Sequence, residues 1–238
     1  MNSSELEEYQ LLQLLRLVSP ALPVGSFAYS QGLEGGVEQG WVKTEEDSVQ
    51  WIIDILTNNL ASLDLPALFW QLSALDCGDT GDFVNFNEII FAYRETAEFR
   101  LESHQMGQAL LRLLRDTHCH SEVKGGVREL LYETQFERID WVSAFAVAAY
   151  NAQLNQQSAL SGYAWAWCEA QVAAAIKLVP LGQTQGQRVL IRLISEIAEL
   201  VRGLLADMPD KNNIGAISAN LAIISSLHET QYSRLFRS

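Results

Sequence analysis

The sequence is poor in basic residues, in cysteine and in long apolar runs. Of its 238 residues, 16 are Lys or Arg and 29 are Asp or Glu, which gives a formal net charge of −13. A chain with this charge repels phosphate groups, which argues against general nucleic-acid binding and against binding to anionic membranes. Apolar runs such as 141–150 are shorter than the roughly 20 residues that a membrane-spanning helix needs.

Cysteine usage and the first residues point to a cytoplasmic protein. Cys77, Cys119 and Cys168 are an odd number and are widely spaced, which does not suit a disulfide framework and favours a reducing compartment. Residues 1–8 are acidic, the opposite of a signal-peptide start. Two catalytic signatures are also missing: a glycine-rich loop ending in Gly-Lys-Ser/Thr for a nucleotide, and the nucleophile elbow of a hydrolase.

What the sequence does have is helical periodicity almost everywhere. Ser4 and Glu7 form a capping box before one run of apolar residues spaced three or four apart, and Thr44 with Asp47 predicts the start of another helix. Asp64 before Leu65-Pro66 predicts the start of another helix, because proline is tolerated in a first turn. Strand-like alternation is absent, so we predict one all-α domain over 1–238 with about eight to ten helices. The predicted helices cover 4–18, 44–60, 64–77, 83–115 with room for a break, 123–137, 139–154, 158–178, 188–205 and 217–227.

Two clusters of polar residues carry potential chemistry. His118-Cys119-His120 places three soft metal ligands in a row, which suits either a transient metal contact or a plain polar turn. We expect the turn, and predict no structural metal and no cofactor. Glu95, Glu98 and Glu102 are expected on one helix, where carboxylates serve acid–base catalysis, a partner-binding face or an ordinary solvated surface.

The segment 19–36 does not have the composition of an ordinary surface loop. After a proline turn, Ser26 is expected to cap a helix in which Tyr29, Leu33 and Val37 share one face. Glycines inside such a helix are unfavourable, but they let another backbone approach closely. The approaching element belongs either to this domain or to a partner protein.

The last residues, Tyr232-Ser233-Arg234-Leu235-Phe236-Arg237-Ser238, interleave two arginines with apolar and aromatic side chains. Arginine and aromatic residues are common anchors of protein interfaces. We therefore predict that 229–238 is a docking tail that becomes ordered when a partner binds. The alternative is a tail docked on its own domain, with its arginines paired to acidic neighbours.

Four stretches together resemble the UreF family of urease accessory proteins, and the resemblance covers most of the chain. The four stretches, in chain order, are Pro23-Val24-Gly25 with Tyr29-Ser30-Gln31-Gly32-Leu33-Glu34, then Arg94 to Arg100 with Gln105-Met106-Gly107, then Val179 to Arg188, and finally His228 to Ser238. The segment 139–146 departs from the family pattern, which has a His-Pro-containing stretch there, so no role of that histidine is transferred.

The resemblance implies a non-catalytic, all-helical protein that often dimerises. It implies assembly with a UreD-like (UreH-like) protein and a UreG-like GTPase, which deliver nickel to the urease apoprotein. The runner-up is an all-α enzyme that uses the Glu95/Glu98/Glu102 face. The residues expected to bind partners are Pro23, Gly25, Tyr29, Ser30, Gln31, Gly32, Glu34, Glu98, Gln183, Gln187, Tyr232, Arg234, Leu235, Phe236 and Arg237.

Overall fold

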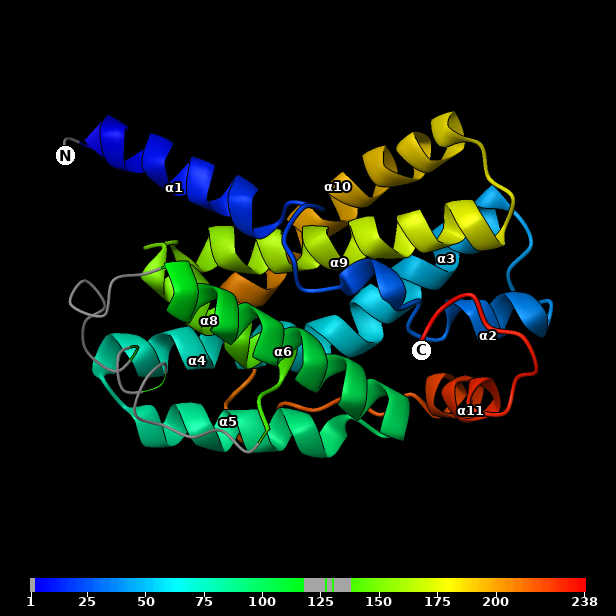
Figure 1. The fold of residues 1–238 in the computed structure, drawn as a ribbon. Coiled ribbons are helices and arrows are strands. Elements are labelled where there is room, and N and C mark those ends of the chain that lie inside the picture. Colours follow the sequence, from blue (N-terminus) through cyan, green and yellow to red (C-terminus); the bar gives the residue numbers. More distant parts are fainter. Residues whose placement is uncertain (1–2, 118–126, 128–129, 131–137) are drawn as a thin grey trace.

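The structure, a computed structural model, describes residues 3–117, 127, 130 and 138–238 (Figure 1). Within these residues the chain is helical and has no strand, which confirms the predicted all-α fold. The elements are α1 (Ser3–Leu17), the 3₁₀ turn η1 (Ser26–Ala28), α2 (Leu33–Glu38), α3 (Glu45–Ile55), the π-helical η2 (Leu56–Asp64), α4 (Leu65–Cys77), α5 (Thr80–Tyr93), α6 (Ala97–Thr117), α8 (Trp141–Asn151), α9 (Gln156–Leu178), α10 (Gln183–Ala206) and α11 (Ala219–His228).

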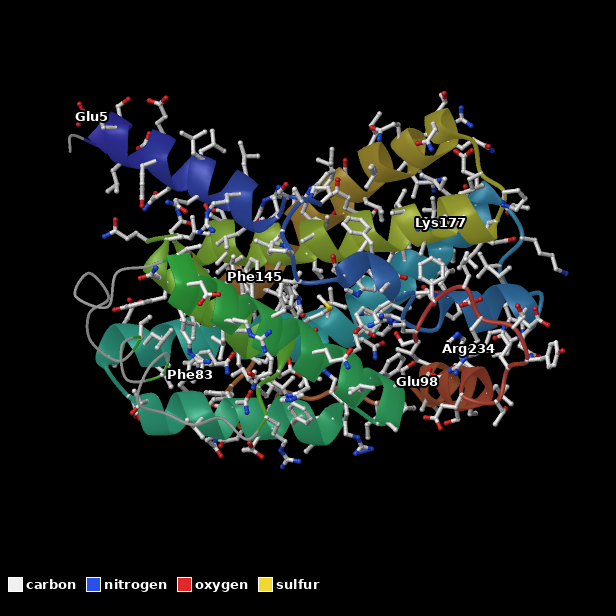
Figure 2. All side chains as sticks on the ribbon, viewed as in Figure 1. Glu5, Phe83, Glu98, Phe145, Lys177 and Arg234 are labelled. Carbon is white, nitrogen blue, oxygen red and sulfur yellow. The ribbon has the colours of Figure 1, made fainter. Side chains whose placement is uncertain are left out.

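Helix α9 crosses the middle of the molecule, and the other helices are arranged around it (Figure 1). It packs most extensively against α10, and α3, α4, α8 and α2 also contact it. On the other side of α8, the α4–α5 pair and α6 complete the bundle. Phe83, Phe86 and Phe145 are fully buried in this core, and Phe145 packs edge-on against Tyr163 of α9 (Figure 2).

Helix α4 begins at Leu65, where the sequence predicted a helix start, but the chain does not break before it, because α3, η2 and α4 form one continuous helix from Glu45 to Cys77. Pro66 is accommodated where the π-helical η2 passes into α4, so the chain does not need to break. By length and composition this helix could cross a membrane, but 56% of its most apolar window is buried inside the fold. We therefore assign the stretch from Glu45 to Cys77 as a core helix of the bundle.

The chain breaks between α5 and α6, at Arg94 to Thr96. Thr96 accepts a hydrogen bond from the Phe99 amide at 3.3 Å and so caps α6. Glu95 lies in this break, whereas Glu98 and Glu102 lie on α6. The expectation that the three glutamates share one helix face is therefore wrong for Glu95.

The single helix expected after Ser26 is also wrong. The chain forms η1, passes through extended Tyr29, and reaches α2 only after Gln31 and Gly32. Both of these residues have left-handed backbone angles, with φ of +51° and +85°, a conformation that glycine adopts readily. This turn separates Tyr29 from Leu33, so the two do not share a helix face.

The glycines of α2 allow α11 to approach closely, and the approaching element belongs to this domain. A Cβ atom on Gly35 would lie 2.6 Å from Cγ2 of Ile224 and 3.3 Å from its carbonyl oxygen. On Gly32, a Cβ atom would lie 2.8 Å from Leu221. The close approach of α11 to α2 brings the carboxy-terminal tail to the amino-terminal segment of the chain.

We predict that Gly35→Ala lowers the free energy of unfolding by about 1–3 kcal/mol, because the new methyl group displaces Ile224. The matched control is Gly203→Ala in α10, where an added Cβ atom meets nothing within 4 Å. This control should gain about 0.5–1 kcal/mol from helix propensity. Denaturant unfolding of both variants tests the prediction, and an equal effect at the two positions would contradict it.

Candidate partner-binding site at the carboxy-terminal tail

The carboxy-terminal tail is docked along its own domain, as the second of the two interpretations of the sequence had it. From α11 the tail passes α2 and ends beside η1 (Figure 1). The amide of Arg237 donates to the carbonyl of Ala28 at 2.8 Å. The amide and the hydroxyl of Ser30 both donate to the main-chain oxygen of Ser238, at 2.8 and 2.6 Å. These contacts join the last residues of the chain to the amino-terminal motif.

Glu34 of α2 fastens the middle of the tail. Its carboxylate accepts the amides of Leu235 and Phe236 at 2.7 and 2.8 Å. The side chain of Glu34 is 8% exposed, so the donors stand in for the water that the charge has lost. One buried carboxylate therefore satisfies two consecutive amides of a segment that has no regular secondary structure.

His228, at the end of α11, lies between two carboxylates and is completely buried. Its Nε2 lies 3.2 Å from Oε2 of Glu34, and its Nδ1 lies 2.9 Å from Oε2 of Glu98. With a carboxylate at each ring nitrogen, the His228 ring joins α11 to both α2 and α6. We refer to Glu34, His228 and Glu98 as the carboxylate–histidine cluster.

Glu98 also accepts from the tail. Nη1 of Arg234 donates to Oε1 of Glu98 at 2.8 Å, and the two side chains lie next to each other between α6 and α11 (Figure 2). Since the Arg234 side chain is 41% exposed, this ion pair by itself adds little stability. It positions the tail, while the buried histidine contact provides the stronger restraint.

Glu102, one turn further along α6, is the deepest carboxyl group at this site. It accepts from the side-chain amide of Gln31 and from the Ser238 hydroxyl. Trp167 of α9 donates its indole N–H to the other end of Gln31. Burial raises the pKa of Glu102 to about 7, against the opposing effect of the Ser238 and Gln31 hydrogen bonds.

Phe236 anchors the tail by hydrophobic packing. Its ring is 6% exposed and packs in a cluster that includes Leu33 of α2 and Val179 and Leu181 after α9. The ammonium group of Lys177 lies 5.4 Å from the ring centroid, in the range of a cation–π contact. The tail thus also contacts the motif that begins at Val179.

Tyr29 joins the amino-terminal segment to α6 and to the tail. Its hydroxyl donates to the side-chain oxygen of Gln105 at 2.7 Å. Burial raises the pKa of Tyr29, and a hydrogen bond with the Arg237 side chain lowers it in part. The sequence motifs around Tyr29, Arg94, Val179 and His228, far apart along the chain, therefore meet around the tail.

The structure brings together most of the residues expected at this site and leaves others apart. Those that meet are Tyr29, Ser30, Gln31, Gly32, Glu34, Glu98, Arg234, Leu235, Phe236 and Arg237. Pro23 and Gly25 are exposed in the turn before η1, and Gln183 and Gln187 are exposed on the first turns of α10. Tyr232 extends fully into solvent.

Three residues at the centre of this site were not among the expected partner-binding residues: His228, Glu102 and Ser238. His228 begins the fourth stretch that resembles the UreF family, but with Glu229 it completes no metal-binding motif, because Tyr232 stands where a second histidine would have to be. A single histidine between carboxylates from two other helices has no sequence pattern. Its partners are 130 and 194 positions away along the chain.

A second buried ionic cluster is centred on Arg94, in the break between α5 and α6. Its guanidinium group donates to both carboxylate oxygens of Asp140, at 3.0 and 3.2 Å, and lies 3.1 Å from Asp64. Tyr163 donates to Asp64 at 2.7 Å, and Ser103 donates to Asp140 at 2.6 Å. Asp140 belongs to the divergent segment 139–146, where it also caps α8.

Metal binding gains no support from the described part of the chain. There, no three His, Cys, Asp or Glu side chains are placed to hold an ion. His118-Cys119-His120 lies outside the described residues, so the choice between a metal contact and a turn stays open for it.

The fold and the site define an all-α protein in which the amino-terminal, central and carboxy-terminal sequence motifs meet at a docked tail. Known proteins are similar to this chain over nearly its full length. A family model described as UreF matches residues 42–194. "Urease accessory protein UreF" of Azoarcus sp. (strain BH72) is 44% identical over 96% of this chain and 95% of its own. The protein of the same name from Marinomonas sp. (strain MWYL1) is 42% identical over 97% of this chain and 95% of its own. That from Teredinibacter turnerae is 42% identical over 96% of this chain and 99% of its own. The chain belongs to the UreF family.

The raised pKa of Glu102 predicts a pH-dependent stability. Because the folded-state pKa is about 7 against an ordinary 4.5, the fold has the full benefit of a neutral Glu102 below pH 4.5 and loses it as the pH rises to about 7. Replacement by Gln removes this titration. The free energy of unfolding of Glu102→Gln should therefore rise relative to wild type by about 2–3 kcal/mol between pH 5 and pH 8.

The control for this prediction is Glu38→Gln, an exposed glutamate of α2. Denaturant unfolding at several pH values should give a constant difference between this control and wild type. A difference for Glu102→Gln that stays constant over the same range would show that Glu102 is ionised throughout.

Proposed function

We propose that this protein is a non-catalytic urease maturation factor in the cytoplasm. It joins a UreD-like (UreH-like) protein and a UreG-like GTPase in a complex that delivers nickel, as cargo, to the urease apoprotein. The membership in the UreF family supports the accessory role. The partners follow from the resemblance of the four sequence motifs to that family.

The observation that carries the proposal is an apolar surface on α11 and the tail, held in place by buried ionic contacts. Ile223 and Leu227 are about half exposed, Leu235 is 63% exposed and Tyr232 is fully exposed. We call these four residues the exposed tail face. Ile223 and Leu227 are four residues apart and so share one face of α11, and exposed apolar side chains on one face are typical of protein–protein interfaces. The carboxylate–histidine cluster fixes the backbone beneath them, so a partner meets a largely ordered surface.

The alternative function, an enzyme that uses Glu95, Glu98 and Glu102, loses support from the geometry. Glu98 is occupied by His228 and Arg234, and Glu102 by Gln31 and Ser238. Glu95 lies outside α6. Since two of the three carboxyl groups serve to hold the tail, we assign the site to docking and expect no nucleotide hydrolysis by this chain alone.

We predict that Leu235→Asp weakens binding to a UreD-like partner by at least about tenfold while the protein keeps its helical content. The substitution places a charge on the exposed tail face, yet the backbone contacts of Leu235 with Glu34 remain available. Copurification with the UreD-like and UreG-like proteins, and urease activation in cells that contain them, are the measurements.

The control is Leu101→Asp, on an exposed leucine of α6 that lies outside the exposed tail face. It should copurify and activate urease like the wild type. Equal behaviour of the two variants would contradict the assignment of the tail as the docking site.

Homodimerisation, which the family resemblance also implies, is proposed at α1 and α10. Leu11, Leu12 and Leu15 of α1 are each more than half exposed, although Leu14 and Leu17 already pack on the inner side of the same helix. Exposed apolar side chains that gather on one part of a helix are typical of a surface that another protein covers. In Figure 1, α1 descends from the upper left and α10 from the upper right toward the middle of the molecule, and Ile191 and Ile194 of α10 are also exposed.

We predict that Leu12→Glu combined with Ile194→Glu converts a dimer into a monomer of 26.6 kDa. Each glutamate would be buried without a partner at an interface between two copies, which is strongly unfavourable. Size-exclusion chromatography with light scattering measures the mass. Ile217→Glu, on an exposed isoleucine before α11, should leave the mass unchanged.

A further inference from the structure

A pair of buried hydroxyl groups joins α11 to the start of α6. Oγ1 of Thr96 lies 2.8 Å from Oγ of Ser225, and either hydroxyl can be the donor. Thr96 is 7% exposed and Ser225 is 1% exposed, so the two groups satisfy each other away from water. Figure 1 shows α11 beside the beginning of α6 and below α2. Neither residue was among those expected to bind a partner.

Thr96 is itself held in place by the chain around it. Its hydroxyl accepts a hydrogen bond from the amide of Phe99 at 3.3 Å. A hydroxyl group has one hydrogen and two lone pairs, so Thr96 caps α6 and pairs with Ser225 at the same time. Two residues earlier in the chain, Arg94 donates to both carboxylate oxygens of Asp140. The hydroxyl of Ser225 therefore meets a partner whose position is fixed.

The hydroxyl pair and the contact of His228 with Glu98 hold α11 to α6 at two points. Ser225 and His228 are three residues apart and so share one face of α11. Glu98 lies in the first turn of α6, two residues after Thr96. A single contact permits a helix to turn about that contact, whereas two contacts nearly one helical turn apart fix the rotation of α11 about its own axis.

The opposite face of α11 carries Ile223 and Leu227 of the exposed tail face. Each of them is two residues from Ser225, which on an α-helix is a rotation of about 200°. They therefore lie on the other side of the helix, where they are 54% and 48% exposed. Any rotation of α11 turns these two side chains by the same angle. It also moves the beginning of the tail, because the tail follows directly on His228.

We propose that Thr96 and Ser225 are positioning residues for partner binding at the exposed tail face. Their hydrogen bond fixes the rotation of α11, so that Ile223 and Leu227 face outward while His228 faces α6. Both residues are buried, so they act through α11 and do not touch the partner. This inference rests on the proposed function, because it takes the exposed tail face as the surface that a UreD-like protein binds.

Three substitutions separate this hydrogen bond from the stability of the fold. Ser225→Ala removes the hydroxyl of α11 and leaves the cap of α6 intact. Thr96→Ser keeps a hydroxyl for both of its roles and should behave like the wild type. The matched control is Ser143→Ala in α8, which removes a fully buried serine hydroxyl that accepts from Gln71 at 2.6 Å. This control should lower the stability about as much as Ser225→Ala but should not affect α11.

The first measurement needs only the full chain, and it follows the hydrogen exchange of the amides of Leu235 and Phe236. These two amides bond to Glu34 and lie beyond α11 in the chain. In Ser225→Ala they should exchange about three- to tenfold faster, because a displaced α11 no longer holds the tail against α2. In Ser143→Ala their exchange should not change, since a tail opens locally without unfolding of the core.

The second measurement is the affinity of each variant for the UreD-like protein, at a temperature well below unfolding. Ser225→Ala should bind about three- to tenfold more weakly, the change that corresponds to one hydrogen bond. Thr96→Ser and Ser143→Ala should bind like the wild type, because nearly all molecules of both are folded at this temperature. Should Ser225→Ala fail to fold, Thr96→Val takes its place, because valine keeps the shape of threonine but has no hydroxyl.

Weaker binding of Ser225→Ala together with normal binding of Ser143→Ala supports the proposal. The proposal is overturned if Ser225→Ala binds like the wild type, or if Ser143→Ala binds equally weakly, since the hydrogen bond would then contribute to stability alone. A wild-type chain that does not bind a UreD-like protein contradicts the proposed function instead. In that case the exchange of the tail amides still decides whether the hydroxyl pair positions α11.

Discussion

The burial of His228 between Glu34 and Glu98 is the constraint on which the site depends. A buried ionisable ring needs partners on both nitrogens, and here each nitrogen meets a carboxylate from a different helix. Removing any one of the three would leave buried hydrogen-bonding atoms without a partner, which is more unfavourable than the loss of a surface ion pair. The positions of α2, α6 and α11 are thereby fixed relative to one another, and the tail follows from them.

The second ionic cluster, around Arg94, fixes the start of α6, the helix that carries Glu98. Arg94 joins the break before α6 to the amino-terminal cap of α8 and to the end of η2. Glu102, one turn after Glu98 on α6, lies between the two clusters and is influenced by Arg94 and Asp140. The helix that presents Glu98 and Glu102 to the tail is thus held at its start by buried hydrogen bonds, and the tail is docked against a rigid element.

The tail combines two properties that appear opposed. Its backbone and Phe236 are tied to the domain, while Leu235 and Tyr232 remain exposed. This arrangement presents apolar side chains without the entropic cost of ordering a free segment when a partner binds. A docked tail and a partner-binding tail are therefore compatible, although the sequence had suggested them as alternatives.

Local sequence signals predicted much of the helical architecture. The helix start expected at Thr44 is present, and the apolar spacing places α9, α10 and α11 close to their predicted ranges. Local signals failed where tertiary contacts override them. Asp64 resembles a helix cap, but its carboxylate pairs with Arg94 and Tyr163, and the helix continues through it.

The sequence by itself determined the all-α class, the absence of a nucleotide loop and the family to which the four motifs point. Only the tertiary structure decided that these motifs meet, that His228 is the centre of the site, and that Glu102 accepts from both Gln31 and Ser238. The physical reason is the range of the interactions: capping and apolar periodicity act over a few residues, whereas Glu34 and His228 are 194 positions apart along the chain. Buried charged groups pair with residues that are distant along the chain, and the spacing of residues in the sequence does not predict which of them pair.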